Sequence, residues 1–276
     1  MPGLYIVATP IGNLGDLTLR AAALLKGADV IAAEDTRVTA KLLRHLAIKI
    51  PLVAYHDHSD ASVRAALVDR AANEVVALVS DAGTPLISDP GYKLVRDARA
   101  AGRNIITLPG PCAAIAALTL AGLPTDRFLF AGFLPTKAKA RGDAIAELAT
   151  VRATLVLYES GPRLAATLAA LADGLGDRDA AVARELTKLY EECVTGTLND
   201  LAARYTGAPP KGEIVLMVAP PAADTAEDGD DAAVDGALTE ALLTMNVAKA
   251  AKSVAARFGR ERSDVYARGL TLKVRP

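Results

Sequence analysis

The chain has few cysteines and no long apolar run, whereas many cysteines or a long apolar run would point to secreted, zinc-binding or membrane proteins. Its 276 residues include only two cysteines, Cys112 and Cys193, and neither belongs to a Cys-X-X-Cys pair. We therefore expect no disulfide framework and no structural zinc site, and we expect the reducing cytoplasm as the compartment. The first residues lack the basic stretch and long apolar core of a signal peptide, and no apolar run reaches the length of a membrane span.

Two common nucleotide-binding signatures are also missing. The loop at residues 9–16 follows an apolar run and spaces Gly12 and Gly15 as Gly-X-X-Gly, which is neither a dinucleotide fingerprint nor a P-loop. Such a loop is either a tight turn between a strand and a helix or a place where a ligand approaches the backbone. His56-Asp57-His58 has no further histidine nearby, so we predict no metal site.

The net charge of −1 conceals three segments of different charge. Residues 1–220 are neutral, residues 221–236 carry six acids and no base, and residues 237–276 carry eight bases against three acids. We interpret these segments as a globular body, an acidic linker and a basic tail. A neutral body argues against a general nucleic-acid binder, but it is compatible with local patches that contact RNA.

Apolar, β-branched runs alternate with helical stretches, and this alternation predicts an α/β fold with two αβα domains. The first series has strands near 4–8, 28–33, 75–79 and 104–108, with helices near 17–26, 38–47, 60–73 and 91–102. The second has strands near 128–132, 154–158, 180–184, 191–195 and 213–218, with helices near 138–150, 162–172 and 197–204. Strand interiors that are apolar at successive positions predict a mostly parallel sheet in the first series, covered on both faces.

The composition changes at Pro109-Gly110-Pro111, which is followed by an Ala-rich helical stretch, and this change predicts the connection between the two domains. We expect an N-terminal domain over 1–115 and a C-terminal α/β domain over 116–220. The acidic linker then covers 221–236, and the basic tail over 237–276 forms three short helices. The expected tail helices are 237–245, 247–258 and 262–269, with apolar spacing compatible with a helix-turn-helix-like module.

Six motifs occur in unbroken order along the body, at residues 7–16, 33–37, 80–91, 108–113, 183–192 and 211–216. Together they resemble the RsmI family of small-subunit ribosomal RNA methyltransferases, within the tetrapyrrole methylase superfamily. The resemblance implies S-adenosylmethionine in the cleft between two α/β domains, usually in a homodimer. It also implies 2′-O-methylation of a cytidine ribose in the decoding region of 16S rRNA within the small ribosomal subunit, with no role for DNA or a membrane.

The alternatives are another methylase of the superfamily, acting on a tetrapyrrole or a protein, and a non-catalytic RNA-binding assembly protein with a degenerate cleft. The motifs at 33–37 and 183–192 argue against the first, and the intact cofactor loops argue against the second. The chain departs from the family at Gly161-Pro162, where relatives usually have Pro-His, although Arg163 is retained.

The resemblance also implies which residues bind the cofactor. These are Pro10, Gly12, Asp81, Gly83, Thr84, Cys112, Ala113, Leu157, Tyr158, Arg184 and Gly212. Asp81 has a second interpretation, since its carboxylate is equally suited to capping the following turn. Cys112 and Ala113 open a helix whose first amides are free to receive a carboxylate or a hydroxyl.

A ribose 2′-hydroxyl is a weak acid, so a general base would assist its methylation. The candidate catalytic residues are Glu34, Asp35 and Glu185, the last helped by Lys188, and the sequence does not choose among them. Two basic sets, each equally explained by a solvated helix or loop surface, are candidates for RNA phosphate contacts. They are Arg37, Lys41 and Arg44, and Lys137, Lys139 and Arg141.

Overall fold

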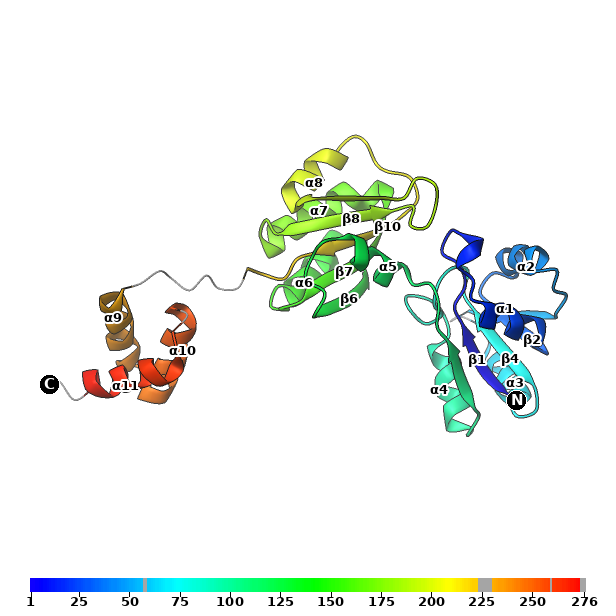
Figure 1. Ribbon diagram of the computed structural model, residues 1–276, viewed down its shortest axis with the longest axis horizontal. Helices are drawn as coiled ribbons and strands as arrows, with labels where there is room; N and C mark the ends of the chain where they lie inside the picture. The colour runs from blue at the N-terminus through cyan, green and yellow to red at the C-terminus, as the bar shows by residue number, and fades with distance from the viewer. Residues whose placement is uncertain (57–58, 223–229, 259, 274–276) are drawn as a thin grey trace. The chain divides into compact units, whose positions relative to one another are not determined.

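The computed structural model describes residues 1–56, 59–222, 230–258 and 260–273. The chain divides into a large unit, residues 1–219, and a small C-terminal unit, residues 220–276. The large unit contains two five-stranded sheets, one in each of two α/β domains (Figure 1). None of the described helices is long and apolar enough to cross a membrane.

The first domain is built on a parallel sheet with the strand order β3-β2-β4-β1-β5. Its elements are β1 (Gly3–Val7), the 3-10 turn η1 (Leu14–Asp16), α1 (Leu19–Lys26), β2 (Val30–Ala33), α2 (Thr36–His45), β3 (Leu52–Ala54), α3 (Ala61–Arg70), β4 (Val75–Val79), α4 (Tyr92–Ala100) and β5 (Ile105–Leu108). Alternate strand residues are buried on opposite faces, one under α3 and α4 and the other under α1 and α2. The predicted parallel sheet with two covered faces is confirmed, and the loops after its strands meet at one edge.

The second domain has a mixed sheet with the order β6-β7-β10-β8-β9. Its elements are α5 (Ala113–Leu120), β6 (Phe128–Phe133), α6 (Ala138–Leu148), β7 (Thr154–Ser160), α7 (Gly161–Leu175), β8 (Asp179–Arg184), β9 (Glu192–Thr197), α8 (Leu198–Tyr205) and β10 (Glu213–Val218). β6 and β7 are parallel, whereas β10 runs antiparallel to β7 and β8, and β8 antiparallel to β9. Helices α6, α7 and α8 cover one face and α5 covers the other.

The domain boundary expected at residue 115 falls inside α5. The buried face of this helix packs with Val156 of β7 and Val215 of β10, so the whole helix belongs with the second sheet. The connection between the domains is therefore the short run Pro109-Gly110-Pro111 that precedes it. Sequence alternation alone does not reveal which of two sheets an Ala-rich helix will cover.

Gly161, where the chain departs from the pattern expected from the resemblance, begins α7. A Cβ at this residue would overlap the carbonyl oxygen of Pro210, so the close approach of the two backbones requires glycine. Pro162 follows in the first turn of α7, where its missing N–H removes no helical hydrogen bond. Glycine at position 161 is thus required by the packing of α7 against the segment that leads into β10.

The C-terminal unit consists of α9 (Asp231–Leu242), α10 (Val247–Phe258) and α11 (Arg262–Lys273), packed around a small apolar cluster that includes Val234, Leu238 and Val254. The three predicted helices are confirmed, but α9 begins inside the stretch expected to be a linker. Its start is explained by Asp230, whose carboxylate accepts a hydrogen bond from the Ala233 amide at 2.9 Å. The acidic residues at this point therefore lie at the N-terminus of a helix, where negative charge is favourable.

Candidate functional site

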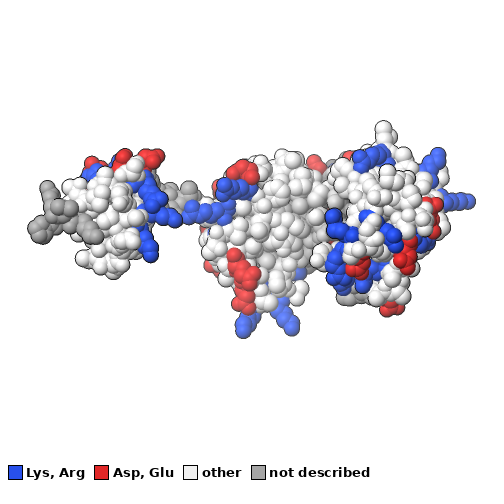
Figure 2. Space-filling model, turned by 90° about the horizontal axis from the view of Figure 1, so that it is seen from below, with Lys and Arg blue, Asp and Glu red and all other residues white. Residues whose placement is uncertain are grey.

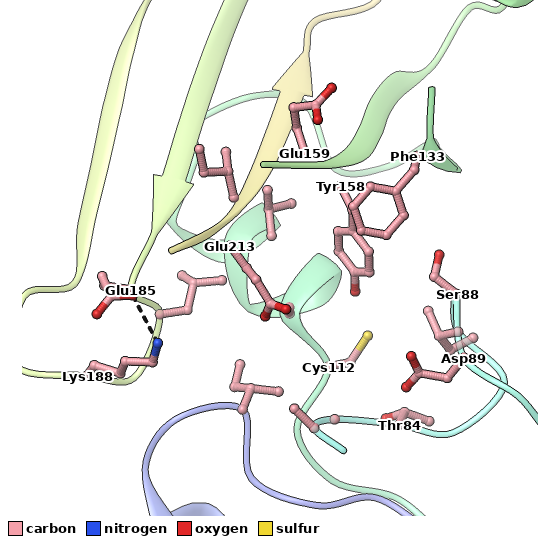
Figure 3. Close-up of a pocket in the computed structure, with 18 residues that line it drawn as sticks. Thr84, Ser88, Asp89, Cys112, Phe133, Tyr158, Glu159, Glu185, Lys188 and Glu213 are labelled. Atoms are coloured by element: carbon pink, nitrogen blue, oxygen red, sulfur yellow. Dashed lines mark hydrogen bonds and ion pairs between the residues drawn. The ribbon is translucent and has the colours of Figure 1, made fainter. Parts of the chain in front are cut away.

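Loops from both α/β domains enclose a cavity of about 160 Å³ in the large unit (Figure 3). The first domain contributes the loops after β1 and β4. The second contributes the start of α5, the ends of β6 and β7, the loop after β8 and the start of β10. The polar residues that line the cavity are Thr84, Ser88, Asp89, Cys112, Tyr158, Glu159, Glu185, Lys188 and Glu213.

Backbone strain gathers around this cavity. Of the five non-glycine residues with positive φ in the described chain, four lie in the two loops that line it. They are Leu86 at 74°, Ser88 at 62°, Glu185 at 51° and Thr187 at 64°. Each such conformation costs about 1 kcal/mol or more and persists only where the surrounding structure holds the backbone in place. Residues of this kind cluster at active sites and ligand-binding sites. The strain marks these loops as functional.

Gly83 joins the loops of the first domain into one rim. Thr9 and Gly83 exchange two backbone hydrogen bonds, of 2.8 and 3.0 Å, and Gly83 adopts a φ of +82°. A Cβ at Gly83 would lie 3.2 Å from Cγ2 of Ile11, so a side chain here would be both strained and crowded. The Thr84 hydroxyl donates to the Pro111 carbonyl at 2.9 Å, which ties the rim to the start of α5. Glycine at this position therefore allows the loops after β1 and β4 to pack closely at the edge of the cavity.

The cavity has a surplus of negative charge. Glu185 is paired with Lys188 at 2.9 Å, but Asp89 and Glu213 form no ion pair with any described residue. Burial raises the pKa of Asp89 above its ordinary value, and the carboxylates of Asp81 and Glu213 raise it further. A cavity lined by uncompensated carboxylates favours a cationic ligand.

Tyr158 contributes a protonated hydroxyl. Burial raises the pKa of its phenol, with smaller contributions from Cys112 and Asp89. The ring packs edge-on against Phe130 and Phe133, at centroid distances of 4.9 and 5.6 Å, and its hydroxyl points into the cavity (Figure 3). Tyr158 can donate or accept a hydrogen bond there, but it is unsuited to act as a base.

Five of the expected cofactor residues line this cavity, namely Gly83, Thr84, Cys112, Ala113 and Tyr158. Two further expected residues, Gly12 and Gly212, pack against the Glu185–Lys188 pair. A Cβ at Gly12 would meet the Lys188 side chain, and a Cβ at Gly212 would lie 2.5 Å from Oε1 of Glu185.

The other expected cofactor residues lie elsewhere. Leu157 is 1% exposed in the core of the second domain, and Arg184 pairs with Glu192 at 2.7 Å. Pro10 and Asp81 line a neighbouring cavity. The Asp81 carboxylate accepts a hydrogen bond from the Asp35 amide at 3.0 Å, so it ties the loop after β4 to the loop after β2 and does not cap its own turn.

The structure brings Glu185 and Lys188, but neither Glu34 nor Asp35, to the lining of the cavity. Asp35 instead caps α2, because its carboxylate accepts the Arg37 amide at 2.8 Å and pairs with the Arg37 guanidinium at 2.6 Å. These hydrogen bonds lower the pKa of Asp35 to about 2, which makes it a weak base. Glu34 is half-buried outside the lining.

Sequence reasoning missed Asp89 and Glu213 although both lie in motifs that carry the resemblance. Asp89 precedes Pro90-Gly91 in the loop after β4, and Glu213 follows Gly212 at the start of β10. Their convergence depends on how the two domains meet, which no local pattern encodes. Glu159 also lines the cavity, but its carboxylate points away (Figure 3), accepts the Thr167 hydroxyl at 2.7 Å and lies 3.3 Å from Arg163.

The two basic sets lie on helices. Lys41 and Arg44 are exposed on α2, and Arg37 is exposed but held by Asp35. Lys137, Lys139 and Arg141 surround the N-terminus of α6, which has no acid in its first turn. Cations are unfavourable at this positive end of a helix, so helix stability does not account for them.

In the described chain, which omits Asp57 and His58, no group of three His, Cys, Asp or Glu side chains is placed to hold a metal ion.

Comparison with known proteins gives a consistent result. The model of the tetrapyrrole (corrin/porphyrin) methylases matches residues 3–202, and that of the RsmI C-terminal HTH domain matches residues 228–273. Ribosomal RNA small subunit methyltransferase I of Erythrobacter litoralis is 58% identical over 99% of this chain and 96% of its own length. The protein of the same name from Mesorhizobium japonicum is 47% identical, over 99% and 92%. Among solved structures, uroporphyrin-III-C-methyltransferase of Thermus thermophilus covers 79% of this chain and 94% of its own, at 25% identity and a TM-score of 0.56.

Proposed function

Because this chain belongs to the RsmI family of the tetrapyrrole methylases, we propose that it is an S-adenosylmethionine-dependent methyltransferase of 16S ribosomal RNA. Its product is the 2′-O-methylated ribose of a cytidine, cytidine 1402 in the numbering used for the family. The observation that carries this proposal is the 58% identity, over 99% of this chain, to a small-subunit rRNA methyltransferase. A cavity whose loops have strained backbone and contain several of the expected motif residues supports it. The place of action is the cytoplasm, where small ribosomal subunits are found.

The cavity suits S-adenosylmethionine in its chemistry. Gly83 holds the loops after β1 and β4 together at the rim, the start of α5 at Cys112 offers free amides, and Asp89 with Glu213 supplies negative charge. The cofactor, when bound, supplies a methyl group activated by a positively charged sulfur. Of the candidate bases, Glu185 is the one in the cavity lining, where Lys188 fixes its carboxylate at 2.9 Å. We assign Glu185 to accept the proton of the ribose hydroxyl.

Asp89→Asn is expected to weaken S-adenosylmethionine binding selectively. Removal of one carboxylate should raise the Kd for the cation about tenfold, or ~1.4 kcal/mol, while S-adenosylhomocysteine, whose sulfur is neutral, changes less than about twofold. Isothermal titration with both ligands measures the difference. Asp69→Asn, at an 82% exposed carboxylate outside the cavity, is the matched control. Equal weakening of both ligands would instead assign Asp89 to a part of the cofactor that they share.

The C-terminal unit supplies a third set of basic residues for the RNA. Helix α10 exposes Lys249, Lys252 and Arg257 and contains no acid, and blue side chains run along one side of this unit in Figure 2. We infer that this helix contacts phosphates of the subunit RNA, together with the basic residues on α2 and at the start of α6.

A chain ended at Ala219 tests that role of the tail, because the large unit closes there. We expect unchanged cofactor affinity and about tenfold weaker binding to small subunits, with a shallower dependence on salt as phosphate contacts are lost. Subunit affinity equal to that of the full chain would show that the tail is not part of the RNA-binding surface.

We also propose that the protein works as a homodimer. Ile115 and Leu120 on α5 and Phe128 on β6 are 48%, 43% and 45% exposed, and β6 is an edge strand of the second sheet. An exposed apolar patch beside an open strand edge is the kind of surface that a second copy covers. Phe128→Asp should shift the species in sedimentation velocity from dimer to monomer, whereas Leu19→Asp, at a 91% exposed leucine on α1, should not. A monomeric wild-type protein would contradict the proposal.

A further inference from the structure

A second cavity lies next to the cofactor cavity, within the first domain. It measures about 180 Å³ and is lined by Thr9, Pro10, Leu14, Val38, Thr39, Lys41, Leu42, Ser80 and Asp81. The same two loops line both cavities. Pro10 and Asp81 face this one, and the residues after them, Ile11 and Ala82, face the other. The backbone hydrogen bonds between Thr9 and Gly83 hold these loops together, so the two cavities are neighbours across a single layer of chain.

Thr39 gives this cavity an unsatisfied polar group. Thr39 is only 3% exposed, and its hydroxyl has no hydrogen-bond partner in the part of the chain that the structure describes. A buried polar group without a partner costs about 1–3 kcal/mol. The side chains around it, Leu14, Val38 and Leu42, are aliphatic. A ligand with apolar faces and a polar edge would satisfy both features.

The charges at the cavity suit a segment of RNA. Helix α2 contains Arg37, Lys41 and Arg44 and no acid, and Lys41 lines the cavity without an ion pair to any described residue. Oδ1 of Asp81 accepts the Asp35 amide at 3.0 Å, whereas Oδ2 accepts no hydrogen bond from the described chain. The cavity thus offers a cation for a phosphate and a carboxylate oxygen for an amino group.

The size of the cavity indicates one ring. A cavity of about 150 Å³ is sufficient for benzene, so about 180 Å³ has room for a single pyrimidine. Sequence-specific RNA recognition takes unstacked bases into such pockets, and enzymes that modify a nucleotide extrude it from its stack.

We propose that this second cavity receives the base of the cytidine that is methylated. The aliphatic side chains of Val38 and Leu42, four residues apart on α2, pack against one face of the ring, and the Thr39 hydroxyl and the Asp81 carboxylate bind its polar edge. Lys41 then lies toward the phosphate. The attached ribose is held at the loops that separate this cavity from the cofactor. This assignment rests on the proposed function.

Three variants test the assignment. Leu14→Trp fills the cavity from a 46% exposed position, so folding is preserved, and Thr39→Val removes the hydroxyl at constant shape. Leu19→Trp, at a 91% exposed position of α1 outside the cavity, is the control. The measurements are isothermal titration with S-adenosylmethionine and kcat/KM for labelled methyl transfer to unmodified small ribosomal subunits. Because the natural chain has no tryptophan, the emission of the indole introduced by Leu14→Trp also reports subunit binding.

We expect all three variants to bind the cofactor within about twofold of wild type. Methyl transfer should fall more than about 100-fold in Leu14→Trp and about tenfold in Thr39→Val, as expected for a lost hydrogen bond, and should be unchanged in Leu19→Trp. Wild-type transfer by Leu14→Trp would overturn the assignment, and so would a matching loss of cofactor binding. A wild-type protein that binds the cofactor but methylates no subunit would refute the proposed function itself, and the assignment with it.

Discussion

Gly83→Asp should abolish binding of S-adenosylmethionine, with a loss of affinity above about 100-fold, or ~2.7 kcal/mol. The left-handed φ of +82° disfavours any side chain at this position, and the new Cβ would lie 3.2 Å from Ile11. The introduced side chain would also displace Ile11, which lines the cavity. Isothermal titration of the folded variant measures the loss.

Gly102→Asp separates this effect from backbone strain alone. Gly102 has a similar φ of +68°, but a Cβ there would meet nothing within 4 Å. Its aspartate variant should lose a comparable amount of thermal stability and still bind the cofactor as the wild type does. Cofactor affinity in Gly83→Asp equal to that of Gly102→Asp would show that the rim is not at the binding site.

Gly161→Ala should produce the largest loss of stability of any single methyl group added to the large unit, about 3 kcal/mol. The new Cβ would overlap the Pro210 carbonyl oxygen, which is backbone and cannot rotate away. The start of α7 and the segment leading to Gly212 and Glu213 would have to separate, so cofactor binding should weaken as well.

The free energy of unfolding in urea should be measured for this variant and for the control Gly142→Ala. Gly142 lies within α6, and a Cβ there would meet nothing within 4 Å, so alanine should stabilise the helix by about 0.5–1 kcal/mol. If Gly161→Ala were as stable as wild type, the close contact between α7 and Pro210 would not exist in the protein.

Local patterns were enough to predict most of the fold. The strand at Val75–Val79 and the helices around it follow from apolar runs and their period. Gly83 and Thr84 were selected from the family resemblance, and both line the cavity. The tail helices were predicted from apolar spacing. The start of α9 was not, because an acidic segment is typical both of a linker and of a helix N-terminus, and the capping contact of Asp230 decides between them.

The site was harder to predict, because it depends on which side chains the two domains bring together. Asp35 was selected as an acid at a strand end, but its carboxylate caps α2. Asp81 was selected from the resemblance, and its carboxylate accepts the Asp35 amide. Asp89 and Glu213 are separated by more than a hundred residues of sequence and converge only when the domains meet. No periodicity in either motif indicates that convergence.

The most direct test of the account is isothermal titration of the purified protein with S-adenosylmethionine, followed in the same preparation by labelled methyl transfer to unmodified small ribosomal subunits. We predict binding, and transfer of one methyl group to a cytidine 2′-oxygen of 16S rRNA. Binding without transfer to the subunit would contradict the assigned substrate and favour another methylase of the superfamily. Absence of binding would contradict the central claim, since the cavity edged by Gly83 would then not be a cofactor site.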